Sequence, residues 1–200
     1  FDDIYFFGEL ALDGKIKDTI SIFPIVLSLV KQGLIKKVLV CEDSAKKLAN
    51  IPNLQIFYVK NLEEAILFIK SKERKNFLYE KMILDYKTLS VNDELFYYDL
   101  DYKDDFSDVI GQDMAKYAGL ISAAGNHNII FEGSPGCGKS MISKRMQHIL
   151  TPRSLDEILE KAKLQALDYK DVDFSPIRAF RTPHHSSTKS SIFGRGCNFQ

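Results

Sequence analysis

The sequence predicts an α/β fold, and two patterns support this. Short apolar runs of strand length alternate with helical patterns along residues 5–71, which is the order typical of parallel strands joined by helices. A glycine-rich motif then lies between a further apolar run and a further helical pattern. The 200 residues are enough for one or two domains with a buried core.

The first predicted domain covers residues 1–71. Its predicted strands are at 4–12, 38–41 and 54–59, where apolar residues cluster. The clearest helix is at 21–32, because its apolar residues recur at helical spacing before Gly33. Ser44 is a predicted N-cap for a short helix that reaches Asn50. A capping box at 61–64 predicts a third helix with one inward face, formed by Leu62, Ala65, Ile66 and Ile69.

Residues 72–104 are predicted to be a linker that partly packs on its neighbours. A charged run at 71–75 opens this stretch and an acidic run at 99–105 closes it, with scattered aromatic residues between them. The segment Met-Ile-Leu-Asp at 82–85 is similar to the Walker B strand of nucleotide hydrolases. It precedes the glycine-rich motif, which is the wrong order for that class, so a packing role is favoured.

The second predicted domain covers residues 105–200. A helix is expected after Gln112 and up to Ala124, with an inward face formed by Met114, Ala115, Ala118 and Ile121. Pro152 ends a later helix, and a capping box at 154–157 begins the next one. That helix has an apolar face formed by Leu155, Ile158, Leu159, Ala162 and Ala166. From Tyr169 onward the chain is polar and irregular.

The glycine-rich motif fits the pattern G-x-x-x-x-G-K-[ST] of a phosphate-binding P-loop. A predicted strand at 128–132 precedes it, and a predicted helix at 141–150 follows it. The motif binds phosphates in this context between strand and helix. The candidate nucleotide-binding residues are Gly133, Ser134, Pro135, Gly136, Cys137, Gly138, Lys139 and Ser140.

The chemistry of a triphosphate explains these residue types. Glycines allow backbone N–H groups to approach and surround a dense anion. Lys139 is expected to place its ammonium on the β- and γ-phosphates of ATP, and Ser140 to give its hydroxyl to Mg²⁺. The alternative is a plain glycine turn, but a chance match to so long a pattern is rare at ordinary residue frequencies. Cys137 is interpreted as a small filler, although its oxidation would block the loop.

Composition and charge limit the remaining classes. The formal net charge is zero, so the chain as a whole has no basic footprint for nucleic acid, while a local basic patch stays compatible with it. No apolar run reaches membrane-spanning length, and the N-terminus does not resemble a signal peptide. The widely spaced Cys41, Cys137 and Cys197 indicate a reducing, cytoplasmic location. The chain begins with Phe rather than Met, which suggests a fragment.

Three stretches together with the P-loop resemble one family. They are Asp-Phe-Ser-Asp-Val-Ile-Gly-Gln at 105–112, Arg-Ala-Phe-Arg-Thr-Pro-His-His-Ser-Ser at 178–187, and Gly-Glu-Leu-Ala-Leu-Asp-Gly-Lys at 8–15. They look like an AAA+ ATPase, and more narrowly like the magnesium-chelatase-like family often called ComM- or YifB-like and associated with bacterial competence. The resemblance covers nearly the whole chain in the right order, with Ala179 in place of the usual Pro.

The resemblance implies two partial domains. Residues 1–71 would be the C-terminal half of a domain with the fold shared by ribosomal protein S5 domain 2 and Lon-type proteases. The catalytic lysine of Lon-type proteases would fall near Phe23, and neither Phe23 nor its neighbours Ile22 and Pro24 can act as a base. This half-domain is therefore expected to be structural. Residues 105–200 would be the N-terminal part of an AAA+ domain.

The resemblance also implies a second edge of the nucleotide pocket. Backbone at Val109, Ile110 and Gly111 would contact adenine; the alternative is that Val109 and Ile110 only staple the next helix to the core. ATP and Mg²⁺ are the implied cofactors. The implied partners are further copies of the chain, in a hexameric ring when the protein is intact, and DNA is a candidate.

A local basic run follows, formed by Arg178, Arg181, His184, His185, Lys189 and Arg195. Adjacent histidines seldom share one ion, and Zn²⁺ needs about three protein ligands, so a metal site is disfavoured. The resemblance implies a family-specific loop near a ring pore or a partner-binding face, where basic side chains would meet phosphates. An ordinary solvated loop explains the same residues equally well.

Hydrolysis of ATP needs more than a P-loop. It needs a Walker B acid, a residue that positions water, and usually an arginine finger from a neighbouring subunit. After Ser140 no run of four apolar residues ends in Asp-Glu, and 194–197 departs from the glycine triplet that the family carries before this acid. We therefore expect this chain to bind Mg·ATP and not to turn it over alone.

Four functions stay open, of which the first two are what the resemblance implies. The first is part of an oligomeric ATP-driven motor that remodels or moves along DNA. The second is a chelatase-like ATPase subunit that drives metal insertion or protein remodelling. The third is a small-molecule kinase, against which the segment 105–112 argues, because simple kinases begin directly at the P-loop strand. The fourth is an inert remnant whose half-domain exposes apolar surface.

Overall fold

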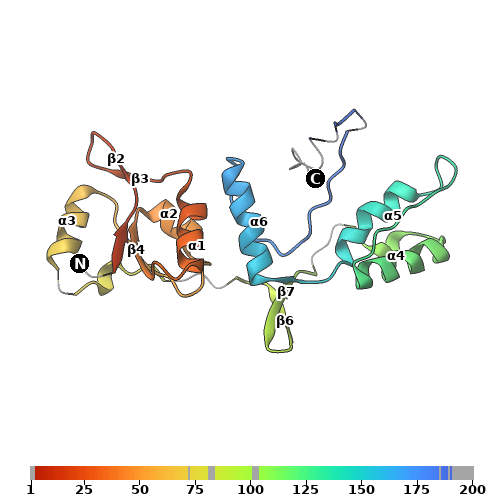
Figure 1. The fold of residues 1–200 in the computed structure, drawn as a ribbon, viewed down its shortest axis with the longest axis horizontal. Coiled ribbons are helices and arrows are strands. Elements are labelled where there is room, and N and C mark those ends of the chain that lie inside the picture. The colour runs from red at the N-terminus through yellow and green to blue at the C-terminus, as the bar shows by residue number, and fades with distance from the viewer. Residues whose placement is uncertain are drawn as a thin grey trace, which may run out of the picture. The chain divides into compact units, whose positions relative to one another are not determined.

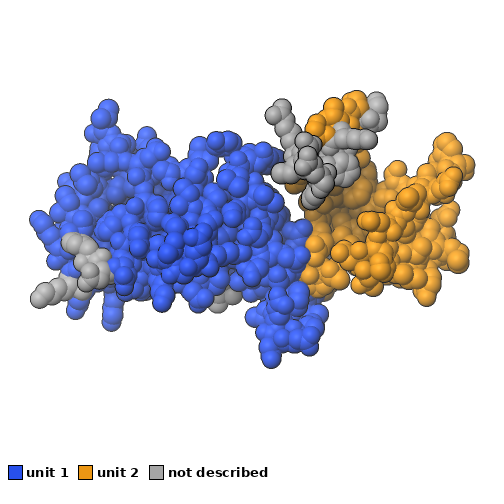
Figure 2. Space-filling view, in the orientation of Figure 1, with its two compact units in different colours: residues 1–98, 153–176 blue, residues 99–152, 177–200 orange. Residues whose placement is uncertain are grey.

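The computed structural model describes residues 3–71, 73–80, 84–100, 104–184, 186–188 and 190. The chain separates into two compact units, which Figure 2 shows in different colours. Unit 1 contains residues 1–98 and 153–176, and unit 2 contains residues 99–152 and 177–200. Residues 99–152 of unit 2 are therefore inserted into the sequence of unit 1, and residues 177–200 follow it. The domains proposed from the sequence, 1–71 and 105–200 with a linker at 72–104, stay a prediction.

The centre of unit 1 is a parallel three-stranded sheet in the order β1-β4-β5. A small hairpin of β2 and β3 follows β1, and helices connect the strands of the sheet (Figure 1). The predicted α/β fold with parallel strands is confirmed. The elements are β1 (Ile4–Phe6), β2 (Glu9–Leu10), β3 (Ile16–Lys17), α1 (Ile22–Lys31), β4 (Lys37–Val40), α2 (Glu42–Leu48), β5 (Gln55–Tyr58) and α3 (Leu62–Lys70).

Helices cover both faces of this sheet. Val38, Val40 and Ile56 are buried in one cluster with residues of α1 and α2. Leu39 and Phe57 are buried in another cluster with Ala65 and Phe68 of α3. Successive side chains of a strand point to opposite faces, so the alternation along β4 produces the two cores. Unit 1 thus has three layers, with helices on each side of the sheet.

Helix α6 (Leu155–Leu167) packs in unit 1, although the sequence analysis assigned it to residues 105–200. Its predicted capping box is present, because Ser154 Oγ accepts the Glu157 N–H at 3.3 Å and Glu157 Oε2 accepts the Ser154 N–H at 3.1 Å. Leu159, Ala162 and Ala166 are buried together with α1, and Figure 1 shows the two helices side by side. The helix and its capping box were predicted correctly, while the sequence analysis named no packing partner for it.

A β-hairpin occupies part of the predicted linker. Strands β6 (Lys87–Val91) and β7 (Glu94–Tyr98) are antiparallel, and the short β8 (Arg153–Ser154) pairs with β7. Asn92 and Asp93 have φ angles of 51° and 65°, which is the geometry of the tight turns that favour such hairpins. The Asn-Asp pair between two runs of alternating residues was a signal for this hairpin.

Three local predictions in unit 1 need correction. Cys41, not Ser44, is the N-cap of α2, and Ser44 is fully buried within the helix. The buried face of α3 contains Ala65 and Phe68, whereas the predicted inward residues Leu62, Ile66 and Ile69 are 43%, 41% and 42% exposed. Phe68 determines this face because it packs against Phe57 and Phe77. The predicted strand at 4–12 is two short strands.

Unit 2 contains α4 (Asp113–Gly125), α5 (Lys139–Arg145) and short 3₁₀ turns at Phe106–Asp108 and Met146–His148. Its buried core is small, with Phe106, Val109 and Ile142 at the centre. The predicted inward face of α4 is wrong for Met114 and Ile121, which are 83% and 51% exposed, whereas Ala115 packs against this core as predicted. The helix instead buries Gly119, Ser122 and Ala123, because Phe106 occupies the space beside Gly119.

The predicted strand at 128–132 is wrong. These residues form neither helix nor strand, and Ile130 is 92% exposed. A strand needs a neighbour for its backbone N–H and C=O groups, and within the described chain no strand pairs with this segment. Residues 82 and 83 of the Walker B look-alike, His185, and residues 194–197 lie outside the described part of the chain.

Candidate functional site

The P-loop connects residues 128–132 to helix α5. Gly136 and Gly138 have φ angles of 82° and 87°, and Gly138 is the N-cap of α5. A Cβ at either position would meet no atom within 4 Å. The requirement for glycine there is therefore torsional, because a left-handed conformation costs other residues about 1–2 kcal/mol.

Lys139 lies folded over this loop. Its Nζ donates to the carbonyl oxygens of Gly133 and Ser134, each at 2.7 Å, and lies 3.4 Å from Cys137 Sγ. These acceptors are neutral. A phosphate oxygen is a charged acceptor and forms roughly twice as strong a hydrogen bond with an ammonium group. The ammonium is thus held at the loop by contacts that an anion can replace.

The other predicted phosphate-site residues lie on or beside the same loop. Ser134, Pro135, Gly136 and Ser140 are exposed, and Cys137 and Gly138 are half-buried. Ser140 is in the first turn of α5, where backbone N–H groups have no partner within the helix and no side chain caps them. The loop therefore presents backbone donors, one ammonium and the hydroxyl groups of Ser134 and Ser140, which is a donor set suited to a bound triphosphate.

The donor set also fits Mg²⁺ carried by a nucleotide. Ser140 offers an exposed hydroxyl oxygen beside the loop, and Mg²⁺ prefers oxygen ligands and keeps several waters while it contacts phosphates. Within the described residues, no three His, Cys, Asp or Glu side chains are grouped as a separate metal site.

The predicted adenine-contact residues have different environments. Val109 is 4% exposed and packs with Phe106 and Ile142, and its carbonyl accepts from Lys116 Nζ at 3.1 Å. Ile110 is 96% exposed, so it does not staple α4 to the core. Gly111 has a φ angle of 69°. Buried Val109 therefore anchors the segment, and Ile110 and Gly111 are left accessible.

The 3₁₀ turn before Val109 is capped by acidic side chains. Asp105 Oδ1 accepts the Ser107 N–H at 3.0 Å, and Asp108 Oδ2 accepts the Asp105 N–H at 2.8 Å. The backbone hydrogen bond from Ser107 holds the pKa of Asp105 below its usual value, and the His148 charge adds a smaller effect. Asp108 also lies 3.5 Å from Arg145.

Sequence analysis missed Arg145, which joins this turn to α5. Its Nη2 is 3.2 Å from Asp104 Oδ1, and only 15% of its side chain is exposed. No motif connects residues so far apart in sequence. A basic residue near the end of the P-loop helix and two acidic residues at 104 and 108 were the only signals available.

The predicted basic run is only partly described. Arg178 donates to the carbonyl of Thr151 at 3.1 Å, Arg181 is exposed, and His184 Nδ1 lies 2.7 Å from Ser186 Oγ. His185, Lys189 and Arg195 lie outside the described residues. Arg178 thus connects its own loop to Thr151, which follows the helical segment after the P-loop. The role predicted for this run in phosphate contact stays a prediction.

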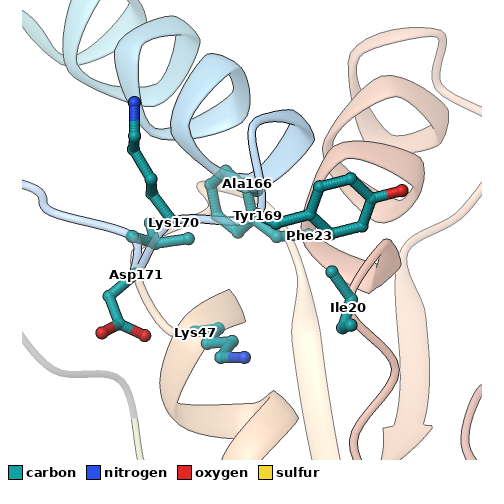
Figure 3. Close-up of a pocket in the computed structure, with 8 residues that line it drawn as sticks. Ile20, Phe23, Lys47, Ala166, Tyr169, Lys170 and Asp171 are labelled. Carbon is teal, nitrogen blue, oxygen red and sulfur yellow. The ribbon is translucent and has the colours of Figure 1, made fainter.

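Unit 1 has a separate cavity of about 130 Å³, lined by residues including Phe23, Lys47 and Tyr169. Figure 3 shows Lys47 from α2 below the segment that carries Tyr169 and Lys170. Lys47 Nζ is 2.5 Å from Asp18 Oδ2, and Lys170 is paired with Asp168. Both ammonium groups are already compensated, so the cavity offers no excess charge for an anion.

Comparisons with known proteins agree with the motifs. The family model of "Magnesium chelatase, subunit ChlI" matches residues 105–200. Competence protein ComM of Haemophilus influenzae is 28% identical over 193 residues, which cover 96% of this chain and 36% of ComM. YifB of Salmonella typhimurium is 29% identical over 191 residues, which cover 94% of this chain and 35% of YifB. YifB of Escherichia coli is 28% identical over 201 residues, which cover 98% of this chain and 36% of YifB.

The chain is thus similar to the magnesium-chelatase-like proteins that include ComM and YifB. The resemblance drawn from the motifs is thereby confirmed. This family is of the AAA+ ATPase type, whose members commonly form oligomers. The chain spans about a third of the length of the curated relatives that it matches. In the described part of the chain, no helix combines the length and apolar character needed to cross a membrane.

Proposed function

We propose that this chain binds Mg·ATP at residues 133–140. The observation that carries the proposal is the position of Lys139, whose ammonium is already bonded to the carbonyl oxygens of the loop at 2.7 Å. The γ- and β-phosphates would replace these carbonyls, the backbone N–H groups of the loop would surround the phosphates, and Ser140 would supply a hydroxyl ligand to Mg²⁺.

The adenosine part of the nucleotide would lie against Val109, Ile110 and Gly111. Support comes from the anchoring of Val109 in the core and from the exposure of Ile110 beside it. The same segment belongs to the stretch matched by the magnesium chelatase family model. Backbone groups at Ile110 and Gly111 are therefore the expected base contacts.

For the whole protein we propose an oligomeric ATP-driven motor, a hexameric ring in the cytoplasm, that acts on DNA. The name of the relative ComM, a competence protein, supports this direction. The alternative is an ATPase subunit that drives metal insertion or protein remodelling, and the family name of the magnesium chelatase subunit ChlI favours that alternative. Residues 1–71 are proposed to be a structural part of a domain related to ribosomal protein S5 domain 2 and Lon-type proteases.

Calorimetric titration of the chain with Mg·ATP tests the first proposal. Lys139→Ala is expected to weaken binding about 10- to 100-fold, because it removes charge-assisted hydrogen bonds to the phosphates. Lys144→Ala is the matched control, since it removes an exposed lysine from the same helix. Equal affinity of the parent chain and Lys139→Ala would refute the site.

Turnover of ATP by the longer protein, with and without single- or double-stranded DNA, separates the two wider functions. Stimulation by DNA that disappears in Lys139→Ala supports the motor. Turnover that is indifferent to DNA supports the chelatase-like or protein-remodelling alternative.

A further inference from the structure

Arg145 is a largely buried cation that joins two parts of unit 2. It ends helix α5, which begins at the P-loop residue Lys139. Its Nη2 lies 3.2 Å from Asp104 Oδ1 and 3.5 Å from Asp108 Oδ2. The side chain of Arg145 is 15% exposed, whereas the side chains of Asp104 and Asp108 are 62% and 48% exposed. Two partly exposed carboxylates, those of Asp104 and Asp108, are therefore paired with the largely buried cation of Arg145.

The guanidinium is also incompletely bonded. Arg145 Nε is buried without a hydrogen-bond partner among the described residues. Burial of a charge is costly unless partners compensate it. The two carboxylates provide that compensation. Two ion pairs to one largely buried guanidinium therefore hold the 104–108 segment against the end of α5.

The acids that Arg145 holds belong to the segment that leads to Val109. Asp108 Oδ2 simultaneously caps the Asp105 N–H at 2.8 Å. Phe106 and Val109 of the same segment are buried against Ile142 of α5. Lys116 of α4 donates to the carbonyl of Val109 at 3.1 Å. The backbone just before Ile110 is thus fastened both to the P-loop helix and to α4.

We propose that Arg145 is a positioning residue for the nucleoside part of the ligand. One end of α5 holds the phosphate loop, and its other end holds, through Arg145, the segment that would contact the base. Loss of Arg145 would release the 104–111 segment from α5 and leave the loop in place. This inference rests on the proposed binding of Mg·ATP and names the residue that determines the affinity for the nucleoside.

Titrations with two ligands test this role. Mg·ATP reports on phosphates and nucleoside together, and inorganic triphosphate with Mg²⁺ reports on the phosphate loop alone. Arg145→Met is expected to weaken ATP binding about tenfold and to leave triphosphate binding unchanged. Lys139→Ala is expected to weaken both. Arg145→Lys keeps the charge but lacks the planar fork of donors, so it should recover part of the lost ATP affinity.

The outcomes separate this inference from the proposed function. A parent chain that binds neither ligand refutes the proposed function. A parent chain that binds both, together with an Arg145→Met variant that binds ATP normally or loses both ligands equally, overturns the positioning role. If Arg145→Met does not fold, Asp104→Asn replaces it, because this variant weakens the same contact at an exposed carboxylate. It should show the same selective loss for ATP with a smaller magnitude, and equal affinities for ATP in parent and variant would then overturn the inference. Lys144→Ala serves as the control on α5.

Discussion

Residues 37–40 of unit 1 and residues 128–132 of unit 2 have similar apolar sequences, but only the first segment is a strand. Val38, Leu39 and Val40 are 0%, 3% and 1% exposed in β4, between β1 and β5. Ile130 is 92% exposed, and no described strand pairs with its segment. Apolar sequence alone therefore indicates that a segment can be a strand, while its hydrogen-bonding neighbours decide whether it is one.

The same difference extends to the cores of the two units. Unit 1 buries residues on both faces of its sheet, whereas unit 2 has a single small cluster around Phe106, Val109 and Ile142. Buried apolar area is the main favourable term in folding. Unit 1 is thus expected to be the more stable support, and unit 2, with the proposed ATP site, the less stable one.

Hydrogen exchange should give the largest contrast between the two segments. The amides of β4 are expected to open with a free energy near that of global unfolding, about 5 kcal/mol or more, and the amides of 128–132 with a free energy near zero. Exchange measured residue by residue by NMR checks this. Equal protection of both segments would mean that 128–132 is paired.

Shortening one buried side chain in the core of unit 1 should have the next largest effect, here on the free energy of unfolding. Leu159 of α6 is 0% exposed, so Leu159→Ala is expected to lower the free energy of unfolding by about 2–5 kcal/mol. Leu164→Ala on the same helix is the matched control, because Leu164 is 67% exposed, and should change it by less than about 0.5 kcal/mol. Urea unfolding followed by far-UV circular dichroism measures both. Similar small losses in both variants would contradict the packing of α6 in unit 1.

A buried hydrogen bond in unit 1 should contribute less than this core residue. Ser44 is fully buried, and its Oγ donates to Asp18 Oδ1 at 2.5 Å. Ser44→Ala leaves that carboxylate oxygen without this donor and should cost about 1–3 kcal/mol. Ser28→Ala is the control, because Ser28 only bonds back to the Pro24 carbonyl of its own helix at 2.8 Å. A loss in Ser28→Ala as large as that in Ser44→Ala would show that the Asp18 contact is not special.

The smallest expected effect is the pH dependence of the contact between α1 and α6. Lys31 Nζ lies 2.8 Å from Glu160 and 3.2 Å from Asp156. The hydrogen bond from Lys31 holds the pKa of Glu160 below its usual value, and the bond to Glu160 raises the pKa of Lys31. Because the folded-state pKa of Glu160 is lowered, its stabilisation is present above the unfolded value, about 4.3, and is lost as the pH falls through the folded value.

The raised pKa of Lys31 places the opposite limit at high pH, because its stabilisation is fully present below the unfolded value of about 10.4 and is lost as the pH rises through the folded value. Solvent screens this exposed pair, so its contribution is expected to stay below about 1 kcal/mol. Urea midpoints of the parent chain and of Glu160→Gln should differ at neutral pH, and the difference should shrink as the pH falls from the unfolded value of about 4.3 through the folded value. A constant difference from acid to neutral pH would exclude the ion pair as its cause.

Much of the local structure of this chain could be predicted from the residues. Capping side chains act within one turn, so Asn61 and Ser154 identified the starts of α3 and α6 correctly. The period of apolar residues identified α1, and the alternation of elements identified the parallel sheet. The P-loop pattern could be recognised in the sequence because it is contiguous, and its role in binding ATP stays a prediction.

The tertiary structure alone decided which faces are buried and which distant residues meet. Phe106 beside Gly119 determines the buried face of α4, and α6 packs on α1 although residues 99–152 of unit 2 lie between them in sequence. Arg145 meets Asp104 and Asp108 only because α5 and the 104–108 segment share a core. Local sequence specifies torsions, caps and periodicity over a few residues, whereas burial and ion pairing depend on partners that the chain supplies from far away.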